Sequence, residues 1–238
     1  MGTSTLLLVR NGQTPWNVEH RFLGWCDVGL TDAGRAEAAQ GGRLLRERNA
    51  VPDVVHTSLQ QRGIRTAELM LEHAERSWIP VRRDWRLNER HYGILQGREE
   101  TVARSAYGDA EVTAWRTEPD NAPPPIADDD EHSQARDPRY KEIRVPRTES
   151  LNAARDRVLA YFEQAVVPDL RQGTVLIATH GNPLRALVAH LAGVDHAEIR
   201  DLNVPGGTAI AYRLDVDTLK PVEPPYLVDA RSSPLTLP

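Results

Sequence analysis

The sequence is poor in the features that mark secreted, membrane-spanning or nucleic-acid-binding proteins. It has a single cysteine, Cys26, so an internal disulfide is excluded, as suits a reducing cytosol. No apolar run approaches the roughly 20 residues of a membrane helix, and no basic region precedes the first apolar run, as in a signal peptide. The net charge of -5 provides no global basic field for nucleic acid. We therefore expect a cytoplasmic protein with neither a membrane nor a nucleic-acid partner.

What the sequence does contain is an alternation of strand-like and helical patterns over 238 residues, enough for one large α/β domain. The expected strands are 5–10, 52–58, 79–87, 173–179 and 208–215. The expected helices are 30–49, 60–74, 148–170 and 181–193. This order predicts an α/β three-layer sandwich, with helices on both faces of a mostly parallel sheet.

Residues 117–147 break this alternation, because they are rich in Pro and Asp and have few core residues. The segment is either a linker between domains or a long excursion over the site, since a loop of this length in a compact domain usually has a function or is mobile. Residues 216–238 are expected to form a loosely attached tail. We favour a single domain over 1–238, with a cap region at about 95–147.

Two expected strand-to-helix turns carry the residues best suited to chemistry. Residues 10–12 read Arg-Asn-Gly, and residues 180–182 read His-Gly-Asn before a proline, which is a good first residue for a helix. Ligands of such sheets lie beyond the carboxyl ends of the strands, and a helix N-terminus presents backbone N–H groups to an anion. The two turns therefore predict an anion site, with N–H groups near Gly181 among its donors.

Arginines and one glutamate add to this expected site. Arg10, Arg62 and Arg65 follow strands or lie early in helices, so they are expected to converge there. Arginine recognises phosphate with two parallel hydrogen bonds. Glu89, after the third expected strand, is placed to supply a proton.

Simpler interpretations exist for each residue taken alone. Asn11 suits a turn, His180 suits a buried core position, and Cys26 suits packing. The acidic run at 128–132, which ends in His132, is typical of a solvated loop rather than a metal site. We therefore predict no metal and no tightly bound cofactor.

The motifs in combination are more specific. LLLVRNG, WNVEHRFLGWCDVGLTDAG, TSLQQRGIRT, LNERHYGILQG, AWRTEPDNAPPP, ESL, ATHGNPLRALV and LNVPGGTAIAYRLD occur in family order over residues 6–214. The sequence thereby resembles the cofactor-dependent phosphoglycerate mutases of the histidine phosphatase superfamily. The resemblance implies a mixed, mainly parallel sheet with a helical cap, and a phosphohistidine intermediate. In that family the first turn reads Arg-His-Gly, so Asn11 stands at the position of the nucleophile.

The remaining site residues are also implied by the resemblance. Arg10, Arg62 and His180 match the family's phosphate-binding residues, and Glu89 matches its acid/base. Further matched pocket positions are Asn17, Gly24, Tyr92, Glu100, Arg116, Gly181 and Asn182.

Three positions depart from the family pattern beside Asn11. Leu23 replaces a small polar residue, Glu100 replaces a lysine, and Thr117 replaces an arginine. The last two changes remove two positive charges and add one negative charge. Like charge against an anion costs several kcal/mol, roughly. We therefore expect that phosphoglycerate is not the natural ligand, and that Glu100 meets a hydroxyl-rich or amino-bearing group.

Three hypotheses follow for the function. The chain is a family enzyme whose nucleophile was replaced by design, a natural enzyme that works without a phosphohistidine, or a non-catalytic binder of a phosphorylated metabolite. The three changes beside Asn11 favour the last two hypotheses. In each case we expect one small phosphorylated ligand and a chain that can assemble into a homo-oligomer.

Overall fold

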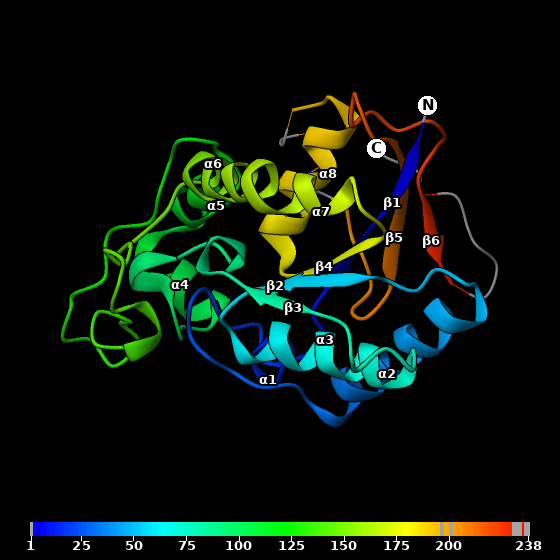
Figure 1. Cartoon of the computed structure of the whole chain (residues 1–238). Helices are drawn as coiled ribbons and strands as arrows, with labels where there is room; N and C mark the ends of the chain where they lie inside the picture. The colour runs from blue at the N-terminus through cyan, green and yellow to red at the C-terminus, as the bar shows by residue number, and fades with distance from the viewer. Residues whose placement is uncertain (1, 196–197, 200–201, 230–234, 236–238) are drawn as a thin grey trace.

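The apolar runs of the sequence form a mixed sheet with the strand order β3-β2-β4-β1-β5-β6 (Figure 1). This computed structural model describes residues 2–195, 198–199, 202–229 and 235. The strands are β1 (Thr3–Arg10), β2 (Val54–Thr57), β3 (Val81–Arg83), β4 (Val175–Thr179), β5 (Ala209–Asp215) and β6 (Tyr226–Val228). β1 to β4 are parallel, whereas β5 is antiparallel to β1 and β6 to β5. The expected mixed, mainly parallel sheet is confirmed.

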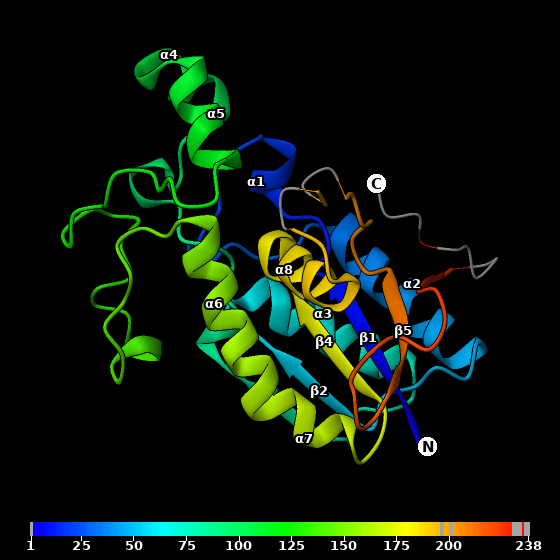
Figure 2. The same cartoon turned by 90° about the horizontal axis from the view of Figure 1, so that it is seen from above.

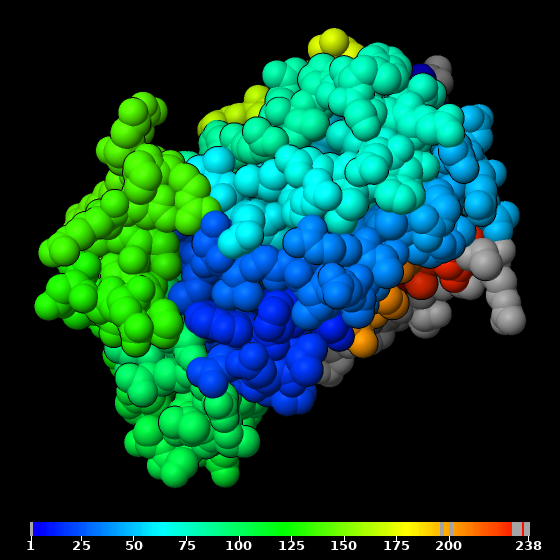
Figure 3. Space-filling view, turned by 90° about the horizontal axis from the view of Figure 1, so that it is seen from below, coloured from blue at the N-terminus to red at the C-terminus, as the bar shows by residue number. Residues whose placement is uncertain are grey.

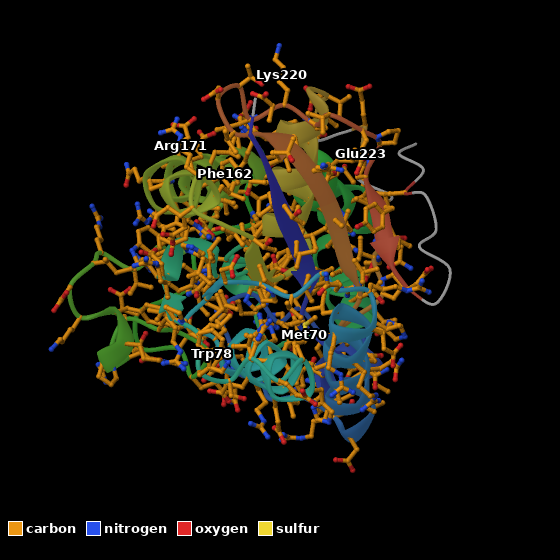
Figure 4. All side chains as sticks on the ribbon, turned by 45° about the vertical axis from the view of Figure 1, so that its right-hand side comes forward. Met70, Trp78, Phe162, Arg171, Lys220 and Glu223 are labelled. Atoms are coloured by element: carbon orange, nitrogen blue, oxygen red, sulfur yellow. The ribbon has the colours of Figure 1, made fainter. Side chains whose placement is uncertain are left out.

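Helices cover both faces of the sheet, as expected (Figures 1 and 2). One face packs against α2 (Asp32–Glu47) and α3 (Gln61–His73), and the other against α6 (Leu151–Tyr161), α7 (Val167–Leu170) and α8 (Gly181–Ala192). Successive side chains of β1 point to opposite faces, so alternate leucines enter different cores. This explains why β1 is continuously apolar. Figure 4 labels one residue of each of these two cores, Met70 in α3 and Phe162 directly after α6.

Two expected elements are shorter than the sequence pattern indicated. The helix expected over 148–170 is divided into α6, a π-helical turn η4 (Phe162–Val166) and α7. Pro168 has no N–H to continue the helical ladder, and the π turn just before it accommodates the break. The strand expected over 79–87 ends at Arg83, because the Asp84 side chain accepts a hydrogen bond from the Arg86 N–H and starts the 3-10 turn η1 (Trp85–Leu87).

Residues 93–147 form a lobe that stands beside the sheet rather than on it (Figure 2). It contains η2 (Gly93–Leu95), α4 (Glu100–Tyr107), α5 (Asp109–Thr117) and η3 (Pro138–Tyr140). Figure 2 places α4 and α5 near α1 (Pro15–Val18), and Figure 3 shows the green part of the chain as a lobe beside the blue N-terminal part. Phe22 donates its N–H to the Arg98 carbonyl at 2.9 Å. This contact joins the lobe to the loop after α1.

Part of the tail that was expected to be loose is paired. Tyr226–Val228 forms the edge strand β6 against β5. A strand of three residues after two prolines is too short to show an alternating pattern in the sequence. Residues 230–234 and 236–238 of the expected tail lie outside the described residues.

Candidate functional site

Three neighbouring parallel strands end at the same edge of the sheet. Arg10, the last residue of β1, pairs with Thr179 of β4, and Thr57 of β2 pairs with Ala178. The residues that directly follow these strands are therefore close together, although they are far apart in the sequence. They are Asn11, Ser58 and His180.

Hydrogen bonds connect these three side chains in a row, with His180 in the middle. The Asn11 Nδ2 group donates to the Gly12 carbonyl at 2.8 Å, which directs Oδ1 toward Nδ1 of His180 at 2.9 Å. Nε2 of His180 lies 2.8 Å from the Ser58 hydroxyl, which already accepts the Gln60 N–H. Since Oδ1 can only accept, Nδ1 of His180 carries the proton, and Nε2 accepts from Ser58.

Burial keeps His180 in this neutral form. The side chain is almost completely buried, and this burial lowers the pKa of His180 well below its ordinary value. The positive charges of Arg62, Arg157 and Arg10 lower it further. His180 can therefore offer its Nδ1–H as a hydrogen-bond donor, whereas its unprotonated nitrogen faces a buried hydroxyl.

A cavity of about 320 Å³ opens beside these residues. The expected site residues that line it are Arg10, Asn17, Glu89, Tyr92, Glu100, Arg116, Gly181 and Asn182. The cavity is not lined by Asn11, Gly24, Arg62 or His180, which the family resemblance implied as site residues. The wall is mainly cationic, since four arginines and two glutamates contribute to it.

Arg62 is more deeply placed than a ligand-binding arginine was expected to be. Its guanidinium donates to the carbonyl oxygens of Gly24 and Cys26, both at 2.8 Å, and its side chain is buried. Gly24 has a φ of +51°, the left-handed conformation that favours glycine, and this turns its carbonyl toward Arg62. Burial raises the pKa of the Cys26 thiol to about 12, so Cys26 is a packing residue as the simpler interpretation had it.

Glu89 occupies the N-terminus of α8, where an anion was expected. Its carboxylate accepts the backbone N–H groups of Gly181 at 3.1 Å and Asn182 at 3.2 Å, together with the Asn182 side-chain amide at 3.0 Å. The Arg90 N–H adds a fourth bond at 2.8 Å. In this structure the anion at these N–H groups is the Glu89 carboxylate, brought there by a long-range contact between Glu89 and the start of α8.

A buried ion pair supports the loop that carries Glu89. Arg157 and Glu149 pair at 2.6 Å, with side chains that are 8% and 6% exposed. Arg157 also donates to the carbonyl oxygens of Asn88 at 2.8 Å and Glu89 at 2.9 Å. Arg157 thereby positions Glu89 through the backbone carbonyl of Glu89. The helical pattern of 148–170 did not indicate this role.

The far wall of the cavity comes from the lobe. Glu100, the first residue of α4, pairs with Arg116 of α5 at 2.5 Å and with Arg104 at 2.7 Å. Leu23 lines the same region and has no hydroxyl group to offer. Thr117 does not line the cavity, because its hydroxyl donates to the Thr113 carbonyl of its own helix. The expectation that Thr117 faces the ligand is therefore wrong.

Comparison with known proteins identifies the family of this chain. The model of the histidine phosphatase superfamily (branch 1) matches residues 6–222. The chain belongs to the histidine phosphatase superfamily.

Two similar relatives are named as phosphoglycerate mutases. The 2,3-bisphosphoglycerate-dependent phosphoglycerate mutase of Streptomyces avermitilis is 50% identical over 223 residues, which cover 92% of this chain and 88% of that protein. The enzyme of the same name from Mycobacterium leprae (strain TN) is 53% identical over 224 residues, covering 93% and 90%.

Two solved structures share the fold. Bacillus stearothermophilus YhfR superposes with a TM-score of 0.71 at 26% identity, covering 92% of this chain and 95% of that chain. The phosphoglycerate mutase of Bacillus anthracis superposes with a TM-score of 0.69 at 22% identity, covering 93% of both chains. At that identity the second likeness shows the fold alone.

This histidine phosphatase superfamily member also has site residues that were not expected from the sequence. Arg185 lines the cavity from α8, four residues after Gly181, and this helical spacing places both on one face. His20 and Arg21 line the far side. Arg65, in contrast, was expected in the site and pairs with Glu68 on α3, with a side chain that is 43% exposed. Arg65 does not line the cavity.

No metal centre accompanies the cavity in the described part of the chain, where no group of three or more His, Cys, Asp or Glu residues is placed to hold an ion. His132 packs its ring edge-on against Trp16, with the ring centroids 5.7 Å apart. No helix of the described residues is long and apolar enough to cross a membrane.

Proposed function

We propose that this chain binds small phosphate monoesters in the cavity at the strand ends and forms no phosphoenzyme at residue 11. Membership of the histidine phosphatase superfamily and the names of its relatives support a phosphorylated ligand. Cationic side chains at the near end of the cavity support it physically, because Arg10 and Arg185 both line the wall there. Arginine is protonated at any working pH, so the site stays attractive to phosphate.

The observation that carries the proposal is the environment of Asn11. The lone pair of an amide nitrogen is delocalised, so Asn11 cannot serve as the covalent nucleophile. Its two polar atoms are also committed, one to the Gly12 carbonyl and the other to His180. Loss of a covalent nucleophile removes several orders of magnitude of rate, roughly. Mutase or phosphatase turnover through a phosphohistidine at this position is therefore not expected.

Proton transfer is left to Glu89. His180 has its proton on Nδ1 and its acceptor nitrogen on Ser58, so it suits hydrogen-bond donation better than proton removal. The Glu89 carboxylate lines the cavity and is the remaining acid/base group beside the proposed phosphate site. Glu89 thus favours a second candidate function, hydrolysis of a phosphate monoester by direct attack of water.

Calorimetry with inorganic phosphate tests the binding part of the proposal. We expect Arg10→Ala to weaken binding about tenfold or more, since a hydrogen bond to a charged group contributes roughly 1.5–3 kcal/mol. Arg35→Ala is the matched control, because Arg35 is an exposed arginine on α2. Equal affinities of the unmodified protein and Arg10→Ala, or no binding by either, would contradict a phosphate site at this position.

Phosphoenzyme trapping tests the chemical part. With a phosphorylated substrate, the protein as it stands should form no acid-labile phosphoprotein, whereas stoichiometric labelling of His180 or His91 would overturn the proposal. Asn11→His should restore labelling and phosphatase turnover if only the nucleophile is missing. Mutase turnover by Asn11→His in the ordinary range of roughly 1–1,000 per second would identify an inactivated mutase. Hydrolysis alone would identify a protein with another ligand.

A further inference from the structure

The far end of the cavity is lined by the Glu100 carboxylate, whose two oxygens are unequally bonded in the described part of the chain. Oε1 of Glu100 accepts three arginine N–H groups, two from Arg104 at 3.0 and 2.7 Å and one from Arg116 at 2.5 Å. Among the described residues, Oε2 makes no hydrogen bond, and the side chain is 31% exposed where it lines the cavity. The backbone N–H of Glu100 donates to the His20 carbonyl at 2.9 Å, which anchors this residue to the opposite wall.

Arg116 contacts the same carboxylate and is a hydrogen-bond donor. Its guanidinium lies over the Phe22 ring, 5.9 Å from the centroid, and keeps N–H groups beyond the one given to Glu100. Phe22 packs on Tyr92 with ring centroids 5.4 Å apart, and the Tyr92 hydroxyl accepts from Asn182 at 2.9 Å. These contacts follow one wall of the cavity from the phosphate end to the Glu100 end.

A paired acceptor and donor match some ligand groups and not others. A hydroxyl both donates and accepts, so it satisfies Glu100 and Arg116 together. A carboxylate only accepts, and it would face the Glu100 carboxylate at close range. Glu100 stays ionised in this setting: although burial raises its pKa, the bonds and charges of Arg104 and Arg116 outweigh burial and bring the pKa below its ordinary value.

We propose that Glu100 makes the far half of this cavity select a phosphate monoester whose other end is uncharged and hydroxylated, and reject one that ends in a carboxylate. The inference rests on the proposed phosphate site for the first half of the ligand. Glu100 acts as the specificity-determining residue, and Arg116 is the donor that Glu100 holds in place.

Glycerol 3-phosphate and 3-phosphoglycerate test this directly, because the two molecules differ only in a terminal CH₂OH or carboxylate group. Calorimetry should give affinity at least about tenfold higher for glycerol 3-phosphate, a free-energy difference of about 1.4 kcal/mol. Glu100→Gln keeps an acceptor for the arginines and should bring the ratio close to one. Glu100→Lys should reverse it. Glu111→Gln, an exposed carboxylate change on α5, is the control and should leave the ratio unchanged.

The outcomes separate this inference from the function on which it rests. If inorganic phosphate and both esters fail to bind, the phosphate site itself is refuted. If phosphate and glycerol 3-phosphate bind and 3-phosphoglycerate binds equally or more tightly, only the role of Glu100 is refuted. A preference for glycerol 3-phosphate that persists in Glu100→Gln, with unchanged melting temperature, also overturns that role.

Discussion

Glu149→Gln probes the buried ion pair beneath the Glu89 loop. The Glu149 carboxylate accepts two N–H groups of Arg157, at 2.6 and 2.8 Å, and the His91 N–H at 2.8 Å. The amide keeps the size of the side chain but leaves the Arg157 guanidinium buried without its anion. Breaking such a pair costs roughly 3–5 kcal/mol. Because glutamine retains one acceptor oxygen, we expect a loss near the lower limit, about 3 kcal/mol.

Differential scanning calorimetry at neutral pH measures this loss. A change of 1 kcal/mol shifts the melting temperature of a chain of this size by roughly 2–4 °C, so Glu149→Gln should melt about 6–12 °C lower. Glu163→Gln, an exposed change on the π turn, should melt within about 2 °C of the unmodified protein. If Glu149→Gln melts together with that control, the ion pair does not stabilise the fold as its geometry indicates.

The pH dependence of the same pair provides a second check. Burial raises the pKa of Glu149, but the charge and hydrogen bonds of Arg157 outweigh burial and hold it below the ordinary value of 4.5. The unfolded chain therefore binds this proton at a higher pH than the folded chain. The stabilisation is present above about pH 4.5 and is lost as the pH falls toward the folded pKa. The melting difference between Glu149→Gln and the unmodified protein should accordingly narrow below pH 4.5.

Two further substitutions test the surroundings of the site. Burial lowers the pKa of His91 from 6.5 to about 4, so the unfolded chain takes up the proton first and the protein should lose stability as the pH is lowered from 6.5 to 4. His91→Asn should make the urea midpoint fall less steeply over this pH range. An unchanged dependence of the urea midpoint on pH would contradict the burial effect. Gly34→Ala would place a Cβ 2.2 Å from the Gln13 carbonyl oxygen. The free energy of unfolding in urea should fall by roughly 1–3 kcal/mol, although alanine is favoured over glycine in a helix interior by about 1 kcal/mol. A stabilised variant would refute the close approach.

Local patterns in the sequence determined the sheet and the position of the site. The continuous apolar runs of β1 and β4 indicate strands buried on both faces, and each is followed by a polar turn that must lie at the carboxyl edge of the sheet. Arg10, Asn11, His180 and Gly181 could be placed there without the tertiary structure, because each is adjacent to a strand end. Arg185 was within reach by the same reasoning, since its spacing from Gly181 is that of one helical turn.

The tertiary structure decided which atoms of the site are free. The tautomer of His180 depends on Asn11, 169 residues away, and on Ser58, 122 residues away. Whether Glu89 or a ligand takes the N–H groups of α8 depends on a contact across 92 residues, and the orientation of Glu100 depends on Arg116 from the next helix. Sequence patterns report local backbone preference and burial. These hydrogen bonds form only when separate elements fold against one another, so only the folded chain could determine them.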